Sequence, residues 1–109
     1  MVEWKGDRLF VGYHEFAWSS RTCGYGVYAI LSNGDVVKIG ETAKRPMYYD
    51  LPPGTEAVFR YYESNKGYAT IYLYLRDGRH YEIHEKENFK MPIEISDTLK
   101  NAIIKWLNL

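Results

Sequence analysis

The chain has 109 residues, of which 14 are Lys or Arg and 14 are Asp or Glu, so its formal net charge at neutral pH is zero. The two halves of the chain are also balanced, which excludes a basic arm or an acidic tail that would attract nucleic acid or an anionic membrane. A chain of this length is expected to form one domain, over residues 1–109, with a modest hydrophobic core.

The cysteine content and the apolar runs indicate where the protein resides. Cys23 is the single cysteine, which excludes an internal disulfide and is typical of a reducing compartment. The first residues resemble no signal peptide, and no apolar run approaches the roughly 20 residues of a membrane span. We expect a soluble cytoplasmic protein without a membrane partner. The absence of glutamine is typical of a thermophilic source, although five asparagines weaken that indication.

Strand patterns recur along the first 86 residues, separated by turn sequences. The expected strands cover residues 8–18, 25–32, 36–42, 56–63, 68–75 and 79–86. The sequences "SNGD", "SNKG" and "RDGR" are typical of hairpin turns, and "DLPPGT" links the third strand to the fourth. The pattern then changes to a helical period, with an amphipathic helix expected over 97–108 and an N-cap at Ser96 or Asp97. Its apolar face carries Leu99, Ala102, Ile103 and Trp106.

The two strand-rich stretches resemble each other. Aligning residues 27–41 with 71–85 places Tyr28 on Tyr72 and Gly34 on Gly78, which indicates an internal duplication of a three-stranded meander, with units at about 8–42 and 56–86. The expected fold is therefore α+β, mostly β. Six antiparallel strands would form a small barrel or sandwich, with the C-terminal helix packed on it or on a partner.

The turn at Gly78 decides which face of the second unit is the core. A three-residue loop with Gly78 in a left-handed bulge position pairs Leu75 with Arg79, whereas a two-residue turn would mix apolar and charged groups on both faces. The three-residue loop gathers one apolar face, made of Phe59, Tyr61, Ile71, Leu73, Leu75, Tyr81 and Ile83. The same loop at Gly34 groups Val27, Ala29 and Leu31 with Val37 and Ile39.

The opposite face is rich in tyrosine and is the candidate binding surface. Its residues are Arg60, Tyr62, Tyr68, Thr70, Tyr72, Tyr74 and His80. Tyr and Arg collect at recognition surfaces, so we expect a non-catalytic binding protein that uses these tyrosines, with Arg60 as the polar anchor, to hold a protein partner or a second copy of itself. The alternative is that this face is covered, for example by the C-terminal helix.

Two other functions remain open at this stage. A single-stranded nucleic-acid binder would stack bases on the same tyrosines and contact phosphates through Arg60, Lys66 and Arg76. A carboxylate-based hydrolase would use Glu63 and Glu85, which flank Ala69 in the expected register.

Neither a metal nor a cofactor is expected. His80 and His84 with Glu82 resemble a metal cluster in sequence, but residues four apart on a strand are separated by roughly 13 Å, which is too far for one ion.

Overall fold

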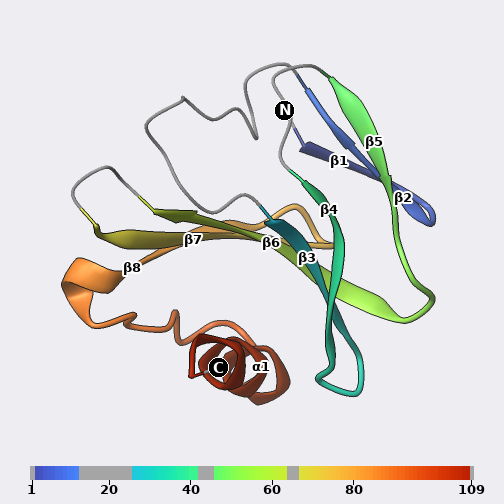
Figure 1. The fold of residues 1–109 in the computed structure, drawn as a ribbon. Coiled ribbons are helices and arrows are strands. Elements are labelled where there is room, and N and C mark those ends of the chain that lie inside the picture. Colours follow the sequence, from blue (N-terminus) through green and yellow to red (C-terminus); the bar gives the residue numbers. More distant parts are fainter. Residues whose placement is uncertain (1, 13–25, 42–45, 64–66, 109) are drawn as a thin grey trace.

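The computed structural model describes residues 2–12, 26–41, 46–63 and 67–108. These residues form two antiparallel sheets and one C-terminal helix (Figure 1). The three-stranded sheet has the order β1-β2-β5, and the five-stranded sheet has the order β4-β3-β6-β7-β8. The elements are β1 (Val2–Lys5), β2 (Arg8–Val11), β3 (Gly26–Leu31), β4 (Val36–Glu41), β5 (Met47–Asp50), β6 (Thr55–Glu63), β7 (Ala69–Leu75), β8 (His80–His84), the 3-10 helix η1 (Glu85–Glu87) and α1 (Asp97–Leu107).

The five-stranded sheet is the central layer and is covered on both faces. Helix α1 lies along one face, and the three-stranded sheet lies over part of the other (Figure 1). The core under α1 joins Phe59, Ile71 and Ile83 of the sheet to Leu99 and Ile103 of the helix. A second core joins residues of the two sheets, namely Val27 and Val58 with Leu9, Val11, Tyr49 and Leu51. No closed barrel forms among the described strands.

The register of the second meander is confirmed. The Leu75 N–H donates to the Arg79 carbonyl oxygen over 2.9 Å, and Gly78 has a φ of +94°, as the three-residue loop requires. Leu73 therefore lies opposite Tyr81, and the apolar face predicted from the sequence is the face that α1 covers. The hairpin at Gly34 follows the same rule near its turn, with a φ of +91° and Ala29 opposite Val37. A bulge between Val27 and Tyr28 then shifts the register by one residue, so Val27 lies opposite Gly40 and its predicted grouping with Ile39 is wrong.

The C-terminal helix is confirmed, and so is its cap. The Leu99 N–H donates to the Ser96 hydroxyl over 3.3 Å, which satisfies a backbone donor in the first turn. At the other end of the helix the Trp106 ring lies among three aromatic rings of the sheet, with centroids 5.0 Å from Tyr28, 5.1 Å from Phe59 and 5.2 Å from Tyr61. Edge and tilted contacts of this kind fix the helix on the sheet.

The first predicted meander is wrong in its first strand. Residues 8–11 form β2, which pairs with β1 and β5 in the other sheet and not with β3; the rest of the predicted strand 8–18, and Cys23, lie outside the described residues. The alignment of Tyr28 with Tyr72 also fails. Tyr28 pairs with Phe59 and Tyr72 pairs with Arg60, so the two tyrosines lie on opposite faces of one sheet. Strand β3 is buried on both faces, so its apolar run carries no alternation that marks a single core face.

Candidate binding surface

The structure brings the predicted site residues together on one face of β6, β7 and β8. Tyr72 lies between Arg60 and Glu82, and Tyr74 lies between Val58 and His80, so the cross-strand rows expected from the sequence are confirmed. The next row continues in the same way, with Thr70 between Tyr62 and His84. Tyr68 precedes β7 and completes the set at the end of the sheet farthest from Gly78.

The three-stranded sheet covers one part of this face, and no other described strand or helix covers the rest. Tyr74 packs against the core formed by Leu9, Val11 and Tyr49, and burial raises the pKa of its phenol. Arg60 is only 8% exposed. Helix α1, which could have covered the tyrosines, lies on the other face of the sheet. Among the described residues, this face is therefore only partly covered, by the sheet of β1, β2 and β5. The sequence patterns did not predict β1 or β5.

Arg60 supports the rings from within the sheet. Its guanidinium carbon lies 4.3 Å from the ring centroid of Tyr72 and 5.7 Å from that of Tyr62. The two rings meet edge to face, with centroids 6.4 Å apart and an angle of 74° between their planes. A buried cation beneath electron-rich ring faces stabilises this arrangement. Arg60 therefore positions the tyrosines, and at 8% exposure its guanidinium is not the outward-facing anchor that the sequence suggested.

The part of the face that no described element covers is a mixed aromatic and polar surface. We define the open tyrosine surface as Tyr62, Tyr68, Thr70, Tyr72, Glu82, His84 and Lys86. None of the described strands or helices lies over it (Figure 1). Tyr68 is 46% exposed, and the Lys86 ammonium nitrogen lies 4.6 Å from the centroid of its ring. The other tyrosines of the surface, Tyr62 and Tyr72, are half-buried.

Charges of both signs surround the rings. Glu82 and His84 approach to 3.5 Å between Oε1 and Nε2, and His84 Nδ1 lies 3.1 Å from the Thr70 hydroxyl. Burial raises the pKa of Tyr72, and the neighbouring guanidinium of Arg60 only partly opposes this. The phenol is therefore neutral at physiological pH. The surface as a whole carries hydrogen-bonding groups without an excess of positive charge.

Of the two carboxylates considered for catalysis, that of Glu85 has a structural role. The Glu85 carboxylate accepts a hydrogen bond from the Ala69 N–H over 2.8 Å, which secures the first residue of β7. Glu63 lies opposite Ala69 on β6, at the same edge of the sheet. Among the described residues, no group of three His, Cys, Asp or Glu side chains is close enough to hold a metal ion. No helix in the described part of the chain is long and apolar enough to cross a membrane.

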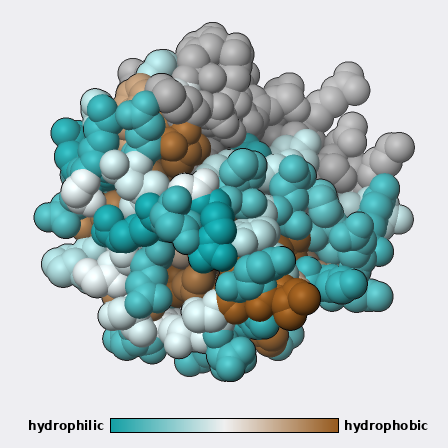
Figure 2. All heavy atoms as spheres, turned by 180° about the vertical axis from the view of Figure 1, so that it is seen from behind, coloured by the Kyte–Doolittle hydropathy of each residue, from teal (hydrophilic) through white to brown (hydrophobic). Residues whose placement is uncertain are grey.

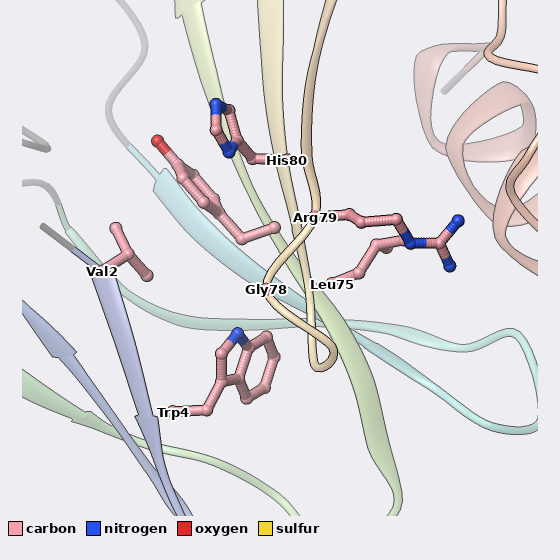
Figure 3. A pocket seen from close by; sticks show the side chains of 7 residues that line it. Val2, Trp4, Leu75, Gly78, Arg79 and His80 are labelled. Atoms are coloured by element: carbon pink, nitrogen blue, oxygen red, sulfur yellow. The ribbon is translucent and has the colours of Figure 1, made fainter.

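The sequence patterns did not single out Trp4, which lines a cavity together with Tyr74 and His80 of the predicted binding surface. A cavity of about 360 Å³ opens between β1 and the β7–β8 hairpin (Figure 3). It is lined by Val2, Trp4, Tyr74, Leu75, Gly78, Arg79 and His80. The available signal was the Gly6-Asp7 pair, a hairpin sequence between two short runs of mixed polar and apolar residues. Each run is only four residues long, too short to show a clear period.

Comparison with known proteins gives no relative. No family model matches the chain, and neither the curated proteins nor the solved structures contain a match.

Proposed function

We propose that this protein is a small, non-catalytic binding protein that holds a protein partner on the open tyrosine surface. The observation that carries the proposal is the fixed pair of rings formed by Tyr62 and Tyr72 over the Arg60 guanidinium. Rings held in this way present apolar area and a hydroxyl donor at little further entropic cost on binding. Such side chains are the usual anchors of protein interfaces.

The distribution of charge favours a protein over nucleic acid. Glu82 and Lys86 place both signs beside the tyrosines, whereas nucleic-acid affinity depends on an excess of cations that contact phosphates. Two of the three cations that could make such contacts are engaged elsewhere. Arg60 is buried, and Arg76 donates to the carbonyl oxygens of Thr55 and Gly6 at the far end of the sheet. Lys66 lies outside the described residues.

The surface also suggests the character of the partner. Few large apolar side chains are exposed among the described residues, and the face shown in Figure 2 carries hydrophobic residues in separate patches among hydrophilic ones. A partner would meet tyrosine rings and paired charges, which is typical of an interface between proteins that also exist apart. A second copy of this chain offers the same complementary charges and is the simplest partner. The single cysteine supports a cytoplasmic setting for the complex.

The test compares two exposed tyrosines in matched settings. Tyr68 is 46% exposed beneath Lys86, and Tyr48 of the three-stranded sheet is 42% exposed beneath Arg8, whose guanidinium carbon lies 4.2 Å from the ring centroid. Self-association is measured by sedimentation velocity, and binding to a purified partner is measured by calorimetry. We expect Tyr62→Ala and Tyr68→Ala to weaken association at least tenfold, as loss of an interface anchor does, and Tyr48→Ala to leave it unchanged.

Two results would contradict the proposal. The first is association of equal strength in Tyr68→Ala and Tyr48→Ala. The second is tight binding of single-stranded DNA or RNA that falls steeply with salt and is lost in Tyr68→Ala, since that result would favour the nucleic-acid function.

A further inference from the structure

The cavity between β1 and the β7–β8 hairpin is independent of the open tyrosine surface. Its walls come from elements that the chain brings together over a long sequence separation, namely Val2 and Trp4 from β1, and Tyr74, Leu75 and His80 from the β7–β8 hairpin. Its volume of about 360 Å³ lies within the range of small-ligand sites. Figure 3 shows Trp4 and His80 on opposite sides of the cavity, with Val2 beside them.

Trp4 is held in place from outside the cavity. The Arg76 guanidinium carbon lies 4.8 Å from the centroid of its ring, and Arg76 is fixed by hydrogen bonds of 2.8 Å to the Thr55 carbonyl and 3.2 Å to the Gly6 carbonyl. Arg76 does not line the cavity, so the part of the indole that faces the cavity is available to a ligand. The indole N–H donates no hydrogen bond to any described residue, and Figure 3 shows it directed into the cavity.

The opposite wall is aromatic as well. The His80 ring stacks on Tyr74, with centroids 6.4 Å apart and 28° between the planes. His80 is exposed and makes no hydrogen bond within the described part of the chain, so its ring nitrogens can donate to or accept from a ligand at the rim. The floor at Gly78 is bare backbone at a φ of +94°, a conformation that disfavours any side chain there.

We propose that this cavity binds a planar heteroaromatic ring system of the size of a nucleobase. The ring would lie between the aromatic walls, with an acceptor on its edge facing the indole N–H of Trp4 and its opposite edge near His80. The charges around the cavity select against a cation. The guanidinium of Arg76 already lies over the Trp4 ring from outside the cavity. Arg79 lies at the rim, where its side chain turns away to pair with Asp77 over 2.7 Å (Figure 3). An aromatic cage for an ammonium group would lack such neighbours.

The experiment follows the indole N–H signals of the ¹⁵N-labelled protein by NMR during titration with adenosine, uridine, indole and trimethylphenylammonium. A Trp4→Phe variant assigns the Trp4 signal. We expect a saturable shift of this signal with at least one of the three neutral rings, at millimolar dissociation constants or tighter. We also expect a weaker response to the cation, and an unchanged signal from Trp106.

Three variants separate this site from the proposed protein interface. His80→Ala removes an exposed rim residue and is expected to weaken ring binding several-fold, whereas His84→Ala, on the same strand and face, is expected to have no effect. Tyr68→Ala should leave ring binding intact even where it abolishes partner binding. The proposal is overturned if none of the neutral rings gives a saturable shift of the Trp4 signal, if the cation binds more tightly, or if His80→Ala and His84→Ala behave alike.

Discussion

Trp106 connects helix α1 to three aromatic rings of the central sheet, so its removal tests how the helix is held. Trp106→Ala would abolish contacts with Tyr28, Phe59 and Tyr61 at centroid distances of 5.0–5.2 Å. Each aromatic pair contributes about 0.5–1.5 kcal/mol beyond burial. A large aromatic replaced by alanine in a core costs about 3–5 kcal/mol, and Trp106 is only partly buried. We therefore expect a loss of about 3 kcal/mol in the free energy of unfolding.

Urea denaturation measures this loss, and a second residue of the same helix supplies the control. Ile104 is 45% exposed on α1, so Ile104→Ala should change the free energy of unfolding by less than about 0.5 kcal/mol. In a thermal scan, Trp106→Ala should lower the Tm by about 12 °C or more. Equal effects of the two variants, or a loss below about 1 kcal/mol for Trp106→Ala, would refute this account of how α1 docks.

Three further predictions concern the remaining layers. Burial, aided by the Glu41 carboxylate, raises the pKa of Tyr49 from 10.0 to about 12. The stabilisation from its neutral phenol is therefore complete below about pH 10 and is lost as the pH rises toward 12. In unfolding curves at alkaline pH, Tyr49→Phe should lose less stability over this range than the unsubstituted protein does. Gly40→Ala places a methyl carbon 2.9 Å from Cε1 of Tyr49 and should cost about 1–3 kcal/mol in urea, but no further cost should appear in a Tyr49→Ala background. Ser96→Ala removes the acceptor for the Leu99 N–H and should cost about 1 kcal/mol, whereas Ser96→Asp should retain most of the stability.

The hairpin registers could be predicted because two local signals agreed. At Gly78, only a three-residue loop with a left-handed glycine gathers the apolar residues on one side, and the alternation of β7 is unbroken from Ala69 to Leu75. The helix could be predicted equally well, because the spacing of its apolar residues and the capping residues at its start indicate the same element. The cross-strand pairing of β6, β7 and β8 followed from the turn types and from the alternation of the strands.

The three-stranded sheet could not be predicted in the same way. Strands β1 and β5 have four residues each, and β5 lies between Pro46 and Pro52, where proline argues against a strand. Their stability comes from long-range pairing and from the core around Leu9 and Val58, which no local pattern encodes. The meander assigned to residues 8–42 failed for the same reason.

The sequence therefore predicted which residues of the candidate site are neighbours across the strands, but not how deeply each residue is buried. The sequence placed Arg60, Tyr72 and Tyr74 on one face correctly. Among the described residues, the exposure of each one depends on the three-stranded sheet. That sheet packs Tyr74 against the core that contains Tyr49, and no described strand or helix covers the other end of the face. The cavity beside Trp4 is lined in part by β1 of the same sheet, so local sequence patterns could not predict it either.

Site-specific photo-cross-linking tests the central claim most directly. A photoreactive phenylalanine analogue replaces Tyr68 in one variant and Tyr48 in the other, two positions of nearly equal exposure on different sheets. If the open tyrosine surface holds a protein partner, the probe at position 68 forms a defined cross-linked protein product, either the partner or a second copy of the chain. The probe at position 48 then forms none. Cross-linking of equal strength at both positions, or a product only with nucleic acid, would contradict the proposed function.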